Sequence, residues 1–311
     1  MRQKLIAPCG GAIAKNKEIM SEISKGWENQ VYRPYSELKV SNPEDLDTWG
    51  NAFRDGELIN AYTDERLIAD VFTKPISAVE YSSEEPFLLA DFGSAEGYVA
   101  YTVSTQLQSN GIQVQPIGLD SNSKSLELMK QRFPSVRGIE ADLSNISLDQ
   151  NSIDAGILRF TLPYFGEKAQ PLVLQQINRV LKNGGRVVIS HDGAYSDDLG
   201  SSYNQFFAEA TAAVMDKPIE VVKASRHFPS CEALQRMANL TGYKIADARD
   251  LTEDVVSFLS PEAYASRFSM TEAQQDNLHQ VFETWKNRGV LPFDPQTLRV
   301  RRPMYSCVLD K

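Results

Sequence analysis

Cysteine and histidine are scarce in this chain, with three residues of each among 311. Cys9, Cys231 and Cys307 lie far apart and form no C-x-x-C pair, which excludes a disulfide framework and fits a reducing compartment. Nowhere do His, Cys, Asp and Glu cluster with the spacing of metal ligands, so we expect no bound metal.

Long apolar runs and an excess of basic residues are absent too. No stretch approaches the roughly 18 apolar residues that span a bilayer, and Leu5–Pro8 is too short for a signal-peptide core. The formal net charge of −9 argues against a nucleic-acid-binding surface. We therefore expect a cytoplasmic protein that binds a small molecule, with no nucleic-acid or membrane partner. The sequence leaves the oligomeric state open.

The most informative stretch is residues 87–98, where a short apolar run is followed by an acidic turn that carries glycines. The run Phe87–Ala90 is long enough for a buried strand and too short for a helix. Helical sequence follows the turn at once. A strand, a tight turn and a helix N-terminus place free backbone N–H groups beside a ligand.

The turn lacks the complete dinucleotide motif G-x-G-x-x-G, because Ala95 and Tyr98 stand where its second and third glycines would be. A phosphate-binding G-x-x-x-x-G-K-[ST] is missing as well. The pattern that fits is Asp91-x-Gly93-x-x-x-Gly97. A carboxylate ahead of the turn suits a ligand with a positive charge or an amino group better than a phosphate.

Strands and helices alternate beyond this turn, which indicates a parallel sheet with right-handed crossovers. The predicted strands after Phe87–Ala90 are Val114–Leu119, Val136–Glu140, Ile153–Phe160, Arg186–Ser190, Tyr243–Ala248 and Met304–Leu309. The predicted helices are Gly97–Ser109, Lys124–Arg132, which Ser121 or Ser123 can cap, Ala169–Leu181 and Cys231–Leu240.

Three segments lie outside this alternation. Residues 1–85 are predicted to form a helical N-terminal extension, with one helix near Ala12–Ile23 and helical spacing of apolar residues from Leu58 to Val71. This extension could cover the ligand site as a cap or simply pack against the sheet. An insertion over 193–229 and a segment over 252–298, helical from Ser260 to Asn287, are predicted to face the substrate. Residues 86–311 would form the core that carries both.

The motif Asp91-x-Gly93-x-x-x-Gly97 resembles the first motif of class I S-adenosylmethionine (SAM)-dependent methyltransferases, typically D/E-x-G-x-G-x-G. Ala95 departs from its middle glycine. Glu140–Leu143 and Leu181–Gly185 match later parts of the family pattern. The resemblance covers about 87–250 and the last strand. It implies an α/β fold: a Rossmann-like, mostly parallel sheet of seven strands with helices on both faces and an antiparallel last strand.

Two acids at strand ends carry the expected cofactor contacts. Asp120 ends the second strand, where a carboxylate can accept both hydroxyls of a ribose, although it could instead cap a helix. The resemblance implies that Asp142 binds the adenine amino group; the alternative is a solvated loop acid. The predicted cofactor-binding residues are Asp91, Gly93, Ser94, Ala95, Gly97, Asp120, Ser121, Asp142, Leu143, Arg159 and Phe160.

The methyl acceptor is harder to identify. Methyl transfer is an in-line displacement that needs a base only when the nucleophile carries a proton. His191 directly follows the fifth strand and is the best candidate base, although a histidine satisfied by nearby loop backbone is the simpler interpretation. Tyr164 and His227 are the other catalytic candidates. The [DN]-P-P-[YF] tetrad of amide and base N-methylating relatives is missing, since the chain reads Thr161–Phe165 there.

These features predict a SAM-dependent methyltransferase of secondary metabolism. It would act on a small or medium-sized molecule by O-methylation of a natural-product intermediate, with N- or C-methylation left open. Two alternatives remain. One is a nucleotide-cofactor oxidoreductase of Rossmann type, which the incomplete glycine motif disfavours. The other is a non-catalytic partner that keeps the fold, for which Ala95 is a mild indication.

Overall fold

The structure is a computed structural model that describes residues 51–54, 57–60, 64–81, 84–215, 217–254, 258–265 and 270–311. The helix expected near Ala12–Ile23 lies outside these residues, as does most of the predicted N-terminal extension.

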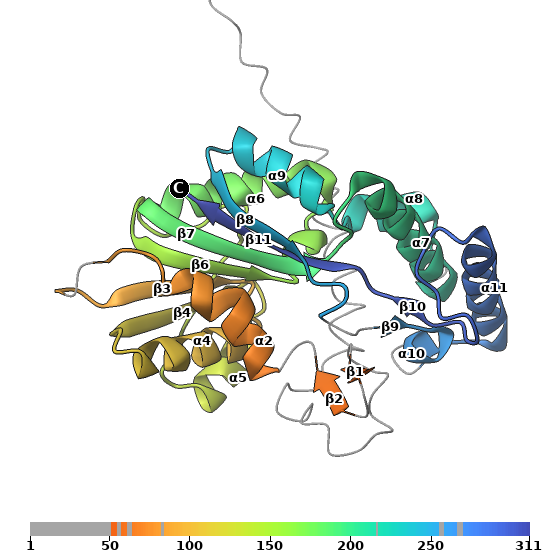
Figure 1. Cartoon of the computed structure of the whole chain (residues 1–311), viewed down its shortest axis with the longest axis horizontal. Helices are drawn as coiled ribbons and strands as arrows, with labels where there is room; N and C mark the ends of the chain where they lie inside the picture. Colours follow the sequence, from red (N-terminus) through yellow and green to blue (C-terminus); the bar gives the residue numbers. More distant parts are fainter. Residues whose placement is uncertain are drawn as a thin grey trace, which may run out of the picture.

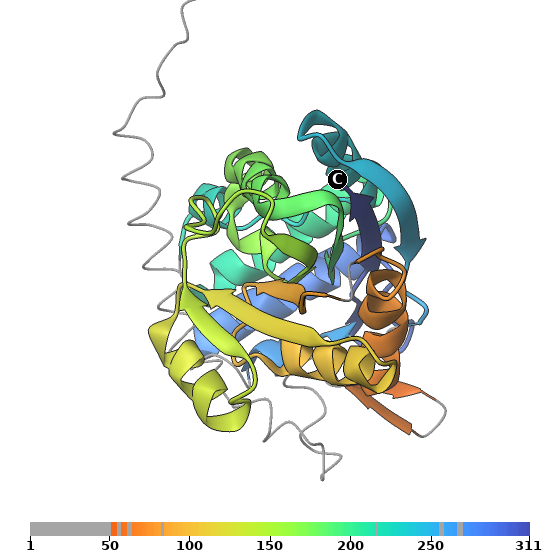
Figure 2. The ribbon, with the colours of Figure 1, turned by 90° about the vertical axis from the view of Figure 1, so that its left-hand side faces the viewer.

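A seven-stranded sheet organises the chain, with the strand order β5-β4-β3-β6-β7-β11-β8 (Figures 1 and 2). Its strands are β3 (Phe87–Phe92), β4 (Val114–Asp120), β5 (Arg137–Glu140), β6 (Ile153–Arg159), β7 (Leu181–Asp192), β8 (Lys244–Asp250) and β11 (Met304–Asp310). Neighbours from β5 to β7 are parallel, whereas β11 pairs antiparallel with both β7 and β8. The predicted fold class is therefore confirmed.

Helices cover both faces of this sheet. They include α4 (Tyr98–Ser109), α5 (Ser123–Arg132), α6 (Gly166–Val180) and α9 (Cys231–Leu240). The adjacent strand residues Leu89 and Ala90 belong to two different hydrophobic clusters, because successive side chains of a strand point to opposite faces. Burial on both faces explains why the central strands are continuous apolar runs.

Helix α5 is capped differently from the prediction. Its N-cap is Asn122, whose side chain accepts from the amides of Lys124 and Ser125. Ser121 and Ser123 flank this position, so the capping prediction was wrong by one residue. Asparagine is as good an N-cap as serine.

The N-terminal part that the structure describes is only partly helical. It comprises β1 (Asn51–Arg54), β2 (Glu57–Asn60), α2 (Glu65–Ile68), the π-helix η3 (Ala69–Thr73) and α3 (Lys74–Ile76). The helical prediction was wrong at Leu58 and Ile59, which lie in β2 and pair antiparallel with β1. A short run of apolar residues is compatible with a strand as well as with a helix, and the pairing with β1 makes this one a strand.

A second group of elements has a hydrophobic cluster of its own. It contains α7 (Asp197–Met215), α8 (Ile219–Ser225), β9 (Phe258–Leu259), α10 (Pro261–Ala265), α11 (Glu272–Arg288) and β10 (Val300–Arg301). The stretch predicted as helical from Ser260 to Asn287 forms α10 and α11. Phe206 of α7 packs edge-to-face on Phe282 of α11, with ring centroids 5.0 Å apart. Figure 1 shows this lobe on the side toward which β3, β6 and β7 run.

The sheet order places a switch point between β3 and β6. The chain proceeds from β3 outward to β4 and from β6 outward to β7, so the crossovers diverge at this position. In open α/β sheets, ligands bind outside the carboxyl ends of the strands at such a point. No described helix combines the length and apolar character that crossing a membrane would require.

Candidate active site

The turn after β3 is built from three left-handed residues at alternate positions. Gly93 has a φ of 81°, Ala95 of 47° and Gly97 of 79°. The positions match the three glycines of D-x-G-x-G-x-G, so Ala95 adopts the backbone conformation that a glycine would provide there. A side chain in this region costs free energy that glycine does not.

Packing also requires the two remaining glycines. A Cβ atom on Gly93 would lie 2.3 Å from the side chain of Thr161, and one on Gly97 would lie 2.5 Å from Met129. The turn is thus wedged between the loop after β6 and helix α5. Its acidic residue Glu96 is buried and forms an ion pair with Arg132 of α5.

Asp120 holds this turn from the end of β4. One carboxylate oxygen accepts from the Ala95 amide at 2.8 Å, and the other accepts from the Asn122 amide at 2.9 Å. A carboxylate offers about four acceptor positions, so Asp120 can accept from ribose hydroxyls as well as from backbone amides. The cap of α5 is Asn122 itself, which leaves Asp120 the role of fixing the turn.

Asp91 is almost fully buried at the end of β3, with 3% of its surface exposed. Burial is the main reason that the pKa of its carboxyl is raised from 3.8 to about 7, and the nearby negative charge of Asp120 adds to this rise. The positive charge of Arg159 and a hydrogen bond from the Ala100 amide lower the pKa and offset part of it. The carboxyl is therefore poised to ionise near neutral pH. A cationic ligand group beside it would favour the ionised form.

The residues after β5 and β4 lie at the edge of the site. Asp142 is exposed, and its Oδ1 accepts from the amide and hydroxyl of Ser144 at 2.9 and 2.6 Å. Leu143 is buried in the main hydrophobic cluster, and Ser121 is exposed. Ser94 lies in the turn after β3. It is buried, and its hydroxyl has no hydrogen-bond partner within the described part of the chain.

The end of β6 contributes a strained residue. Phe160 has a φ of 53°, and its amide donates to the Ser190 carbonyl of β7 at 2.9 Å. The guanidinium carbon of the preceding residue, Arg159, lies 5.1 Å from the ring centroid of Phe160 and 5.9 Å from that of Phe72. Left-handed backbone in a bulky residue is costly and concentrates at functional sites.

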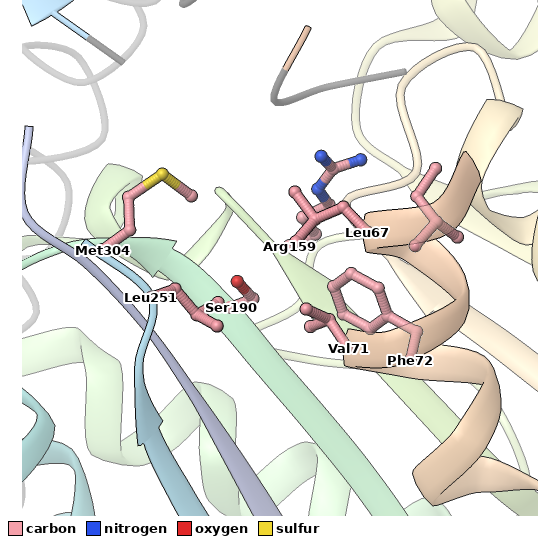
Figure 3. A pocket seen from close by; sticks show the side chains of 8 residues that line it. Leu67, Val71, Phe72, Arg159, Ser190, Leu251 and Met304 are labelled. Carbon is pink, nitrogen blue, oxygen red and sulfur yellow. The ribbon is translucent and has the colours of Figure 1, made fainter. Parts of the chain in front are cut away.

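A small pocket opens beside Arg159 at the ends of β6 and β7 (Figure 3). Its lining comes from the N-terminal helical segment, the residue after β8 and the first residue of β11. The lining residues are Leu67, Ile68, Val71, Phe72, Arg159, Ser190, Leu251 and Met304. Only Arg159 was singled out from the sequence. The others carry no motif, and only the fold brings them together.

His191 is fully buried. Its Nδ1 lies 2.6 Å from the Asp192 carbonyl oxygen and its Nε2 lies 3.0 Å from the Tyr305 hydroxyl. Burial lowers the pKa of this imidazole to about 3, and the nearby His227 acts in the same direction. These contacts favour the alternative of a histidine satisfied by its surroundings.

Tyr164 and His227 come from adjoining segments, since the His227 amide donates to the Pro163 carbonyl at 3.0 Å. Tyr164 is exposed, and the Arg226 guanidinium lies 4.1 Å from its ring centroid. His227 is half-buried, and burial lowers its pKa. No set of three or more His, Cys, Asp or Glu side chains in the described ranges could hold a metal ion.

Comparison with known proteins agrees with this geometry. Residues 89–185 match the family described as "Methyltransferase domain". Demethylmenaquinone methyltransferase of Thermotoga maritima is 33% identical over 87 residues, which cover 28% of this chain and 37% of that protein. The chain spans about half the length, or less, of the curated relatives that it matches.

Two solved structures share the fold. The YcgJ protein from Bacillus subtilis aligns with a TM-score of 0.53 at 15% identity, covering 75% of this chain and 94% of that one. The 4+2 cyclase SpnF aligns with a TM-score of 0.54 at 12% identity, covering 99% of each. Residues 89–185 thus match a methyltransferase domain, and the chain has the Rossmann-like methyltransferase fold.

Proposed function

We propose that this protein is an enzyme that transfers a methyl group from SAM to a small or medium-sized molecule. The observation that carries the proposal is the 2.8 Å hydrogen bond from the Ala95 amide to the Asp120 carboxylate. This bond fixes the left-handed turn beside the switch point of the sheet. The turn and the acid lie at the carboxyl ends of β3 and β4, the edge of an open α/β sheet at which ligands bind.

The site residues fit SAM chemically. Asp120 would accept the ribose hydroxyls, and Asp142 would accept from the adenine amino group. Backbone groups of Gly93, Ser94 and Ala95, with the carbonyls of Arg159 and Phe160, would hold the methionine end, with Asp91 near its ammonium. SAM supplies a methyl group already activated by a sulfonium, so the protein's main task is to position the acceptor in line with it.

The acceptor would enter from the side of η3 and of the lobe that carries α7 and α11. We propose O-methylation of a natural-product intermediate as the leading reaction, with N- and C-methylation behind it. The described cysteines Cys231 and Cys307 are buried free thiols, which supports a reducing compartment such as the cytoplasm. The acidic net charge of −9 favours a small molecule over a nucleic acid as partner.

A second candidate is a protein that keeps the fold and binds SAM without transferring its methyl group. Ala95 favours it, because a residue that departs from the glycine pattern stands in the turn that would hold the cofactor. Methylation of any acceptor would rule this candidate out.

Calorimetric titration with SAM and S-adenosylhomocysteine (SAH) tests the cofactor assignment. We expect binding by the wild type and a loss of about 1.5–3 kcal/mol in Asp120→Ala, because hydrogen bonds to a charged group are lost. Asp149→Ala removes an exposed acid elsewhere as a control. Binding of NAD in place of SAM and SAH would contradict the proposal and favour the oxidoreductase.

A further inference from the structure

The sheet opens at its switch point, between the neighbouring strands β3 and β6 (Figure 1). Their parallel pairing runs from Leu89 opposite Ala155 to Asp91 opposite Ile157, and both strands continue beyond it. The crossovers leave in opposite directions here, so contacts between the two strand ends come from the loops that follow them. A threonine in the loop after β6, Thr161, makes such contacts with both ends.

The side chain of Thr161 packs directly against the turn after β3. Phe160, the residue before it, has a φ of 53°, a left-handed conformation that turns the chain at the end of β6. A Cβ atom on Gly93 would lie 2.3 Å from both the Oγ1 and the Cγ2 atom of Thr161. Thr161 therefore occupies the space that Gly93 leaves open, and the strained backbone of Phe160 leads the chain into this contact.

The hydroxyl of Thr161 lies between two carbonyl groups, one at each strand end. It donates to the Arg159 carbonyl at 2.9 Å, and the Gly93 carbonyl oxygen lies 3.4 Å from the same Oγ1 atom. A hydroxyl has a single proton, so the shorter bond to Arg159 is the main one and the contact with Gly93 is weaker. A carbonyl oxygen has two lone pairs, so a bond from Thr161 does not by itself prevent a second donor.

We propose, on the basis of the methyltransferase function above, that Thr161 is a positioning residue for the amino-acid end of the cofactor. Its hydroxyl holds the carbonyls of Gly93 and Arg159 beside each other, and these carbonyls accept from the ammonium of the cofactor. Thr161 acts through the two carbonyls and needs no contact with the cofactor itself. The nucleoside end depends instead on Asp120 and Asp142, which lie on the other side of β3, at the ends of β4 and β5.

Calorimetric titration of the full chain with SAH and with 5′-methylthioadenosine tests this role, because the second ligand lacks the amino-acid end. Thr161→Val replaces the hydroxyl with a methyl group of similar size. We expect it to weaken SAH binding about 3–10-fold, the effect of one lost hydrogen bond, and to leave 5′-methylthioadenosine binding within about twofold. Thr161→Ser keeps the hydroxyl and should bind both ligands like the wild type.

Thr105→Val is the matched control. The Thr105 hydroxyl donates to the Tyr101 carbonyl at 2.9 Å on the exposed side of α4, so the same kind of bond is lost away from the site. This variant should bind both ligands like the wild type. Urea unfolding shows whether each variant is folded. If Thr161→Val does not fold, Thr161→Ser keeps the test decisive, since it removes only the methyl group.

Three results would overturn the inference. The first is an SAH affinity of Thr161→Val equal to that of the wild type. The second is an equal weakening of SAH and 5′-methylthioadenosine, which would make Thr161 a support of the whole turn. The third is a selective loss of SAH binding in Thr161→Ser, because the methyl group and not the hydroxyl would then be responsible.

SAH binding by the wild type is measured first. Its absence would contradict the methyltransferase proposal itself, whereas unchanged SAH binding in Thr161→Val contradicts the positioning role alone.

Discussion

The Nε2 atom of His191 on β7 lies 3.0 Å from the hydroxyl of Tyr305 on β11, in the fully buried interior. Nδ1 faces the Asp192 carbonyl oxygen, which can only accept, so Nδ1 carries the proton and the tyrosine hydroxyl donates to Nε2. The same hydroxyl lies 3.0 Å from the Pro229 carbonyl oxygen, just before α9, so its single proton is shared between Nε2 and that carbonyl. This pair therefore ties two strands of the sheet to the end of the 193–229 insertion.

Tyr305→Phe should destabilise the fold by about 1–3 kcal/mol, because it leaves Nε2 of His191 buried without its donor. Equilibrium unfolding in urea measures the change. Tyr195→Phe is the matched control, since that tyrosine is exposed and its hydroxyl only approaches the Ala248 carbonyl at 3.4 Å. Equal stabilities for the two variants would show that the His191–Tyr305 bond contributes nothing.

His191 should also make stability fall as the pH drops. Its pKa lies at about 3 in the folded protein, below the ordinary value of 6.5, so the unfolded chain takes up the proton first. The stabilising contribution is complete above pH 6.5 and is lost from there toward pH 3, by about 1.4 kcal/mol per pH unit. Asp91 acts in the opposite direction, because its raised pKa of about 7 makes the folded state hold a proton.

The contribution of His191 is therefore measured as a difference. Urea unfolding at pH 6.5 and pH 5 is compared between the wild type and His191→Asn. We expect a shallower loss of stability on acidification in the variant, by about 2 kcal/mol over this range. Parallel pH profiles would mean that His191 is not held neutral in the folded protein.

Asp91 should make cofactor binding depend on pH. Its carboxyl, with a pKa of about 7, changes from mostly protonated at pH 6 to mostly ionised at pH 8, and only the ionised form attracts an ammonium. We expect the affinity for SAH to rise by up to about tenfold between these pH values. Calorimetry on Asp91→Asn provides the comparison, with weaker and nearly pH-independent binding expected. An unchanged pH profile in that variant would place the ammonium elsewhere.

The sequence alone predicted the sheet well, because buried parallel strands are apolar runs and each is followed by a recognisable turn. The acids Asp91, Asp120 and Asp142 were found for the same reason, since strand ends are visible in the pattern. The pocket was not predictable: Leu67, Leu251 and Met304 are ordinary apolar residues, distant in sequence, that only the tertiary fold brings together. His191 lies at a strand end as well, but its burial depends on Tyr305, over a hundred residues away.

Ala95→Gly tests whether the turn stores strain. Ala95 has a φ of 47°, and the left-handed region costs an L-residue about 1–2 kcal/mol. Glycine removes that cost but gives the unfolded chain more freedom, worth about 0.4–1 kcal/mol. We expect a net stabilisation of up to about 1 kcal/mol in urea unfolding, whereas the β-branched Ala95→Val should destabilise. SAH binding should be retained in Ala95→Gly, since the amide that donates to Asp120 is unchanged. A clear loss of stability in the glycine variant would show that the Ala95 methyl group contributes packing that outweighs the strain of its backbone.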